Sequence, residues 1–236
     1  MSKAKASATT LAAIADRWIA TTGDIGRLIL LSGDLTTGLG YTPTPVDDIL
    51  TCDSAPNWET GTRVRVTATG TQPTPLLSST DYFVIKGADF GGTTTEIKLA
   101  TTLANALAGT PINLEDTGSG TLALNQQQLN ETDPIPVLVS REITHPDYGR
   151  FLVSGVAAAT EVGTTAEKNP VAFSMIVGGG SDPLVFRHFL FLRDALATPG
   201  DTTGTEAQLA TEAAEITISP GTSKVFTLVF RTKNAV

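Results

Sequence analysis

Side chains that commonly bind metals or act as nucleophiles are scarce in this chain of 236 residues, which has two histidines and one cysteine. His145 precedes Pro146 and Asp147, a combination typical of a turn, whereas His188 lies in the apolar segment 184–192. A zinc site generally requires several nitrogen, sulfur or carboxylate ligands at short spacing, whereas the turn around His145 and the apolar segment around His188 favour other roles. The pattern predicts no metal at either residue and a hydrogen-bonded core or interface role for His188.

The remaining candidates for chemistry are Cys52 and three groups of acidic residues. A single cysteine excludes an intrachain disulfide, and Cys52 is predicted to be a structural residue at the end of a strand. Paired carboxylates can hydrolyse glycosides when they face each other across a cleft. The acidic groups Asp47–Asp48, Glu115–Asp116 and Glu131/Asp133 lie instead in predicted turns or linkers, where turn and capping roles explain them.

The sequence motifs of the common catalytic sites do not occur. The chain has no G-x-S-x-G elbow, no G-x-x-x-x-G-K-[ST] loop and no D-x-[DN]-x-[DN]-G run. Gly118-Ser119-Gly120 lies between two predicted short strands, which is typical of a hairpin turn. We therefore expect no enzyme, no catalytic residue, no cofactor and no metal.

Composition limits the partners. The net charge is −8 and the 16 basic residues are scattered, so no nucleic-acid partner is expected. No apolar run approaches the length of a membrane span, so no membrane partner is expected either. Lys3 and Lys5 are followed by apolar positions that Asp16 and Arg17 interrupt, which is not typical of a signal peptide. The expectation is synthesis in a cytoplasm.

The first 25 residues are predicted to form an arm and a short amphipathic helix. Leu11, Ile14, Trp18 and Ile19 recur at helical spacing, and Gly23 follows the end. This helix either covers its own domain or docks on a neighbouring subunit. In the second case Leu11, Trp18 and Ile19 are the expected partner contacts.

The rest of the chain is predicted to be mainly β, in two small antiparallel units of sandwich or jelly-roll type. Residues 26–125 form the first unit and residues 126–236 the second, with a linker at 126–134. The predicted strands of the first unit are 28–31, 49–52, 63–67, 82–85, 97–100, 112–114 and 122–124, with a short helical run at 99–107 ending at Gly109. Those of the second unit are 136–140, 148–156, 171–177, 184–192, 216–219 and 225–231. Residues 206–215 are predicted to form a helical turn or two.

Part of the first unit resembles a module of tailed-bacteriophage structural proteins. The likeness rests on Pro73–Leu76, Thr80–Ile85, Phe90, Ile97–Ala100, Asn105–Thr110 and Gly118–Thr121. In such phage proteins a "pro-x-pro-leu, x-asp-tyr-tyr-val-ile" strand is followed by a "phe-lys-leu-ala" strand, an "ala-leu-x-gly" turn and a glycine-rich hairpin. The match covers residues 73–124, about a fifth of the chain.

This resemblance implies a virion component without catalytic residues. We expect a capsid decoration (cement) protein that binds the particle as a homo-oligomer, with other virion proteins as partners. A tail, neck, baseplate or fibre protein is the alternative within this class. A receptor- or carbohydrate-binding module is a second alternative, and it predicts a groove around Tyr41, Trp58 or Tyr148.

Overall fold

The chain is divided into two units, and the sequence of one is inserted into the sequence of the other. The computed structural model describes residues 26–153, 160–162, 165–167, 171–193, 198–202, 207–228 and 231–233. Residues 34–140 form one unit, and the residues before 34 and after 140 form the other. We call them the barrel unit and the carrier unit. The division predicted from the sequence falls at 125/126. The predicted N-terminal helix, with Leu11, Trp18 and Ile19, lies outside the described residues.

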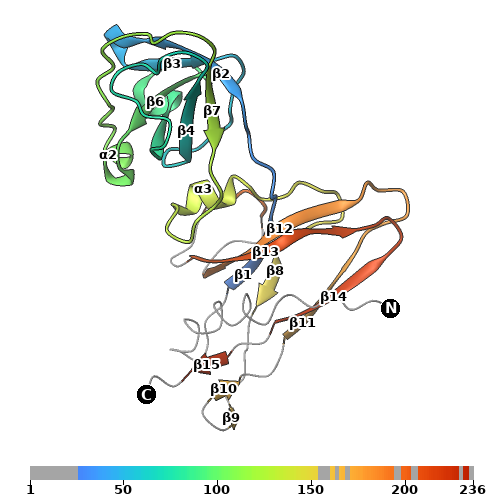
Figure 1. Cartoon of the computed structure of the whole chain (residues 1–236). Coiled ribbons are helices and arrows are strands. Elements are labelled where there is room, and N and C mark those ends of the chain that lie inside the picture. The colour runs from blue at the N-terminus through green and yellow to red at the C-terminus, as the bar shows by residue number, and fades with distance from the viewer. Residues whose placement is uncertain are drawn as a thin grey trace. The chain divides into compact units, whose positions relative to one another are not determined.

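The barrel unit is a closed antiparallel barrel of six strands (Figure 1). Its strands are β2 (Leu39–Thr44), β3 (Ile49–Cys52), β4 (Arg63–Ala68), β5 (Tyr82–Lys86), β6 (Glu96–Ala100) and β7 (Leu122–Gln126). They are ordered β2-β3-β6-β5-β4-β7, and β2 pairs with both β3 and β7 to close the barrel. The expected antiparallel β-structure is confirmed, but this unit is a barrel and not a sandwich. Closure leaves no free sheet edge.

The alternation of residues along the strands explains the barrel core. In β4, Val64 and Val66 are buried while Arg65 and Thr67 are exposed, and the period of two continues in β6 and β7. The core also contains Tyr41 from β2 and Trp58 from the loop before β4. Each strand therefore contributes one apolar face to the inside, as the sequence pattern predicts.

Short helices complete the barrel unit. They are the 3-10 helices η1 (Pro45–Asp47) and η2 (Gly87–Phe90), and the α-helices α2 (Leu103–Leu107) and α3 (Ile135–Val139). Helix α2 begins at Thr102, whose hydroxyl oxygen accepts a hydrogen bond from the Asn105 N–H at 3.1 Å. The backbone turns away just after the helix at Gly109, where φ is +68°. Ala106 of α2 packs with Ile85 and Ala100 on the outside of the barrel.

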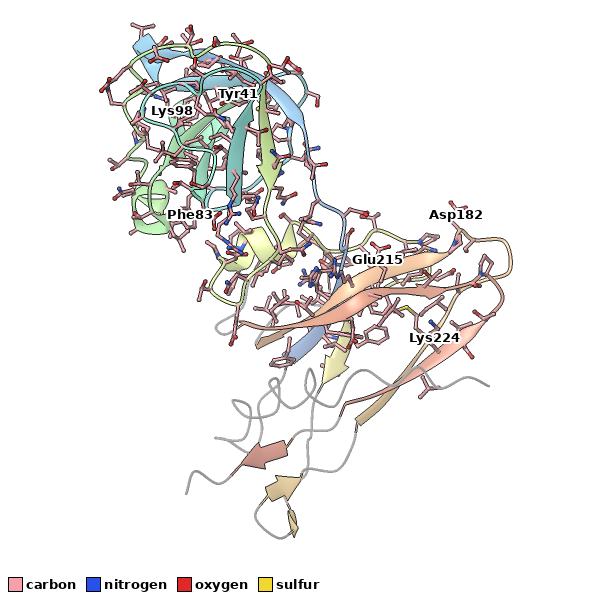
Figure 2. All side chains as sticks on the ribbon, viewed as in Figure 1. Tyr41, Phe83, Lys98, Asp182, Glu215 and Lys224 are labelled. Atoms are coloured by element: carbon pink, nitrogen blue, oxygen red, sulfur yellow. The ribbon has the colours of Figure 1, made fainter. Side chains whose placement is uncertain are left out.

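In its described residues, the carrier unit contains three small antiparallel sheets. Its strands are β1 (Gly26–Leu31), β8 (Phe151–Val153), β9 (Thr160–Val162), β10 (Thr165–Glu167), β11 (Val171–Ile176), β12 (Leu184–Arg193), β13 (Ala207–Ile218), β14 (Ser223–Leu228) and β15 (Arg231–Lys233). The largest sheet has the order β13-β12-β1-β8, so that residues far apart in sequence are neighbours. Strands β11 and β14 form a second sheet, and β15, β10 and β9 a third. Figure 2 shows Glu215 on β13 and Lys224 on β14.

The core of the carrier unit joins the first two of these sheets. Leu28 and Leu30 of β1 and Phe186 of β12 form one buried cluster with Met175 of β11 and with Val177 just after it. The rings of Phe186 and Phe189 meet edge to face at 5.2 Å between centroids. The long apolar segment 184–192 is a strand, as predicted, and the structure places it between β13 and β1 in the sheet.

Three predicted elements are wrong. Residues 136–140 were expected to be a strand, but α3 occupies them; a proline at Pro136 suits the first turn of a helix because its missing N–H has no helical partner there. Residues 206–215 were expected to be helical, but 207–218 form β13 by pairing with β12, so that tertiary pairing overrides the propensity of the Ala- and Glu-rich sequence. Residues 112–114 belong to no strand, although Ile112 and Leu114 are buried in the barrel core.

Candidate functional site

Both histidines are held by hydrogen bonds. His145 lies in a turn, where its Nε2 is 2.8 Å from the carbonyl oxygen of Asp182 and its Nδ1 accepts from the Asp147 N–H at 3.1 Å. His188 is buried in β12, and its Nδ1 is 2.9 Å from the hydroxyl of Thr211 on β13. Burial, with further contributions from Arg141 and Arg187, lowers the pKa of His188 to about 4. The ring is therefore neutral at pH 7 and acts as a hydrogen-bonding core residue.

Cys52 ends β3 in the barrel core, at the strand end that the sequence predicted. Burial, reinforced by the neighbouring Asp53 carboxylate, raises the pKa of its thiol to about 12. The nucleophilic form of cysteine is the thiolate, so this thiol is inert at neutral pH.

One carboxylate in each of the acidic groups singled out in the sequence accepts a hydrogen bond from a backbone N–H. Asp116 Oδ1 accepts from the N–H of Gly118 at 2.8 Å and from that of Thr74 at 3.2 Å, the predicted turn role. Its hydrogen bonds with Thr74 and Gly118 lower the pKa of the Asp116 carboxyl. Asp48 Oδ1 accepts from the Leu114 N–H at 2.8 Å. Among the described residues, no group of three His, Cys, Asp or Glu side chains is placed to hold a metal ion.

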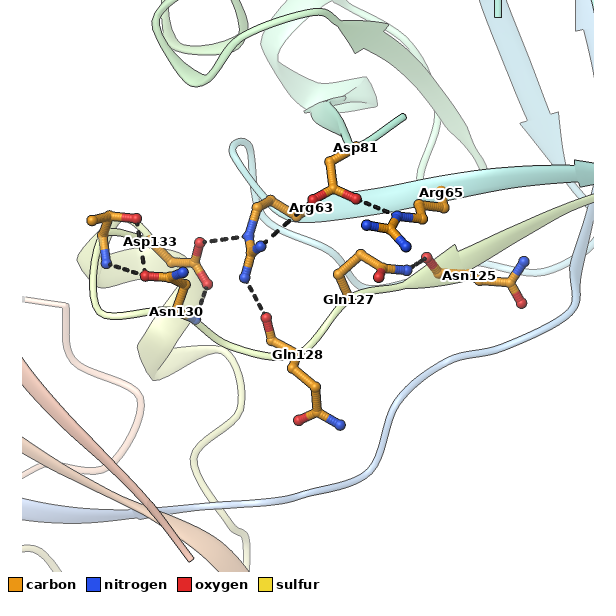
Figure 3. Close-up of polar contacts among 9 residues, drawn as sticks. Arg63, Arg65, Asp81, Asn125, Gln127, Gln128, Asn130 and Asp133 are labelled. Atoms are coloured by element: carbon orange, nitrogen blue, oxygen red, sulfur yellow. Dashed lines mark hydrogen bonds and ion pairs between the residues drawn. The ribbon is translucent and has the colours of Figure 1, made fainter. Parts of the chain in front are cut away.

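An arginine cluster that sequence reasoning missed lies where the chain leaves the barrel (Figure 3). Arg63 of β4 has its Nε 3.1 Å from Asp133 Oδ1, and its Nη2 donates to the carbonyl oxygen of Gln128. Asp133 Oδ2 accepts from the Asn130 N–H at 2.6 Å. Burial raises the pKa of Asp133, while Asn130 and Arg63 oppose that rise. The cluster attaches segment 127–133, which the sequence suggested was a linker, to the barrel wall.

A second buried cluster lies in the carrier unit around Glu142. The side chains of Arg150 and Glu142 are 0% and 4% exposed, and Arg150 Nη2 lies 2.7 Å from Glu142 Oε2. The same carboxylate accepts from Arg150 Nε at 2.9 Å, from the Tyr148 hydroxyl at 2.8 Å and from the Gly200 N–H at 2.6 Å. Glu142 therefore joins segments that lie about 60 residues apart in the sequence.

The aromatic groove that a carbohydrate- or receptor-binding module would need is not formed by the three predicted residues. Tyr41 and Trp58 are buried in the barrel core. Tyr148 is partly buried, and its hydroxyl is engaged by Glu142 and by the Leu30 N–H at 3.2 Å. These rings stabilise cores and do not present an open surface.

Exposed apolar side chains in the carrier unit include two on one face of the β11–β14 sheet. Ile176 is 65% exposed and Val225 44%. The register pairs Ile176 with Ser223 and Ser174 with Val225, so the two apolar residues are diagonal neighbours. Such a pair is a candidate contact for another protein, and sequence alternation alone did not single it out.

Comparisons with protein-family models, with curated proteins and with solved structures return no match for this chain. In the described part of the chain, no helix has the length and hydropathy needed to cross a membrane. The predicted contact residues Leu11, Trp18 and Ile19 lie outside that part.

Proposed function

We propose that this protein is a non-enzymatic structural component of a tailed-phage virion. Capsid decoration is the preferred role, and the protein binds the particle as an oligomer. The tail, neck, baseplate or fibre is the other location in the same class. In this role the protein works by binding other virion proteins, without a cofactor.

The observation that supports the proposal is where the phage-like motif lies in the fold. The segment Tyr82–Ile85 lies in β5, and Ile97–Ala100 lies in β6. Residues 105–109 belong to α2 and its end, and Gly118–Thr121 form the turn before β7. The motif therefore spans three of the six barrel strands, β5, β6 and β7, and lies within a single folded unit.

The buried polar and charged side chains of the described residues support a structural role. His188 and the Cys52 thiol are buried, and the Arg63 and Glu142 clusters are engaged in holding backbone segments together. Each of these groups is used to stabilise a fold. The exposed apolar pair Ile176 and Val225 offers a surface for association.

The test is the location and copy number of the chain in purified particles of the phage that encodes it. Quantitative mass spectrometry should find it in intact virions, and immuno-electron microscopy should place it on the head at a copy number comparable to that of the major capsid protein. A low copy number with label confined to the tail would favour the tail alternative. Absence from virions that contain all their other structural proteins would refute the proposal.

A further inference from the structure

We infer that residues 36–133, which make up most of the barrel unit, form an independently folding acidic insert, and that contacts between copies of the protein are made outside this insert. The second part rests on the oligomer of the proposed function, whereas the first part does not. Three observations carry the inference: how the chain enters and leaves the barrel, how the cores are divided, and where the net charge lies.

The chain enters and leaves the barrel at adjacent positions. Within the barrel unit, Gln126 of β7 donates its N–H to the carbonyl oxygen of Thr36 at 2.8 Å, and its Oε1 accepts from the Thr36 N–H at 3.2 Å. The Gly38 N–H donates to Asn125 Oδ1 at 2.9 Å. The first and last strands of the barrel are thus tied to each other, and the Arg63–Asp133 contact holds the segment that follows.

In the carrier unit, the two segments that flank the insert in the sequence are also bonded to each other. The Ser32 N–H donates to the carbonyl oxygen of Arg141 at 2.8 Å, and the Ile143 N–H donates to that of Leu30 at 3.0 Å. Leu31 and Glu142 form an antiparallel bridge between these two bonds. The carrier unit therefore needs only a short connection between Ser32 and Arg141, because its own hydrogen bonds bring these residues together. Insertions between such adjacent ends are tolerated because they leave the host fold intact.

The apolar cores are assembled separately. The large barrel cluster draws its residues from positions 39–124, and the large carrier cluster from positions 28–30 and 143–218. A closed barrel with its own core satisfies its strand hydrogen bonds internally, since each of the six strands has a partner on both sides. Each unit thus contains the interactions that a domain needs to fold cooperatively.

The net charge is concentrated on the insert. Residues 36–133 contain eleven Asp and Glu residues and four Lys and Arg residues, a net charge of −7, whereas the other 138 residues contain thirteen acidic and twelve basic residues. Seven of the eight net negative charges thus belong to the barrel. In a symmetric oligomer like charges repel, and charged residues are depleted at the centre of interfaces. Inserts of neighbouring copies therefore stay apart, and the nearly neutral remainder makes the contacts.

Calorimetry on the full chain tests independent folding with two matched substitutions of fully buried leucines. Leu124→Ala removes core volume in the barrel, and Leu28→Ala removes the same group in the carrier core. The wild-type chain should show two transitions, and each variant should lower the midpoint of one of them by about 10 °C while leaving the other unchanged. A single transition that both variants shift equally would overturn the inference.

Sedimentation of full-length variants tests where the copies touch. Val84→Asp places a charge in the barrel core and should unfold the barrel alone, with the oligomer retained; Leu28→Asp in the carrier core should abolish the oligomer. Loss of the oligomer in Val84→Asp with an intact carrier transition would overturn the assignment of the contacts. A wild-type chain that stays monomeric at every concentration would refute the oligomer of the proposed function, while the calorimetric result would still decide whether the barrel folds independently.

Discussion

The buried ion pair of Glu142 and Arg150 leads to the sharpest stability prediction. Replacing Glu142 by Gln keeps the shape of the side chain and one acceptor oxygen, but it removes the negative charge that lies 2.7 Å from the buried Arg150 guanidinium. Removing one partner of a buried ion pair costs about 3–5 kcal/mol, because the remaining charge is not solvated. We expect Glu142→Gln to destabilise the carrier unit by an amount in this range.

The double variant shows whether charge or hydrogen bonding dominates. The variant Glu142→Gln/Arg150→Met removes both charges of the pair. Its single Gln oxygen can still accept from Tyr148, which bonds Oε1 in the wild type, or from Gly200, which bonds Oε2. The double variant should therefore be no less stable than either single variant, with a coupling energy of about 1–3 kcal/mol. Tyr148→Phe removes one neutral donor to the carboxylate and should cost only about 1–2 kcal/mol.

The assay is amide hydrogen exchange at pH 7, read separately for the two units. The Ile143 amide, bonded to Leu30, reports on the carrier unit, and the Val84 amide, bonded to Thr62 at 2.9 Å, reports on the barrel as an internal control. Glu142→Gln should accelerate exchange at Ile143 by a factor of more than 100, since each 1.4 kcal/mol is tenfold. A change of less than about 1 kcal/mol, or additive effects in the double variant, would refute the charge argument.

Three further predictions concern single residues. The pKa of His188 in the folded protein is about 4, below its ordinary value of 6.5. Its contribution to stability is therefore complete above pH 6.5 and is lost as the pH falls toward 4, by at most about 1.4 kcal/mol per pH unit. Acid unfolding of the wild type and of His188→Gln should show this pH dependence only in the wild type. The Cys52 thiol, with its pKa raised to about 12, should resist a thiol reagent at pH 8 until denaturant opens the barrel, and a rate equal to that of the unfolded chain would contradict its burial. Arg63→Met should speed amide exchange in segment 127–133 by at least tenfold while the β6 amides are unaffected, and equal acceleration in both would mean that Arg63 stabilises the whole barrel.

Prediction from sequence succeeded where a local pattern decides the structure. The alternation at 63–67, the apolar segment 184–192 and the run ending at Gly109 correspond to β4, β12 and α2. It failed for the predicted helical stretch 206–215, because an Ala- and Glu-rich segment has helical propensity until a long neighbouring strand pairs with it. Strand β12 pairs with 207–211 and with 216–218, on either side of a register shift. The Arg63 cluster was also missed, since its partners lie about 70 residues away in sequence.

The sequence by itself determined the β character of the chain, the inert setting of Cys52 and the turn role of Asp116, because strand alternation and turn chemistry depend on neighbouring residues. Only the tertiary structure decided that 34–140 is inserted between β1 and the rest of the carrier unit. Strand order and barrel closure depend on pairings between distant segments, such as β1 with β12 and β2 with β7, which no local pattern specifies. The bridge between Leu31 and Glu142 and the Ser32–Arg141 hydrogen bond likewise join residues more than 100 positions apart, on the two sides of the inserted segment in the sequence.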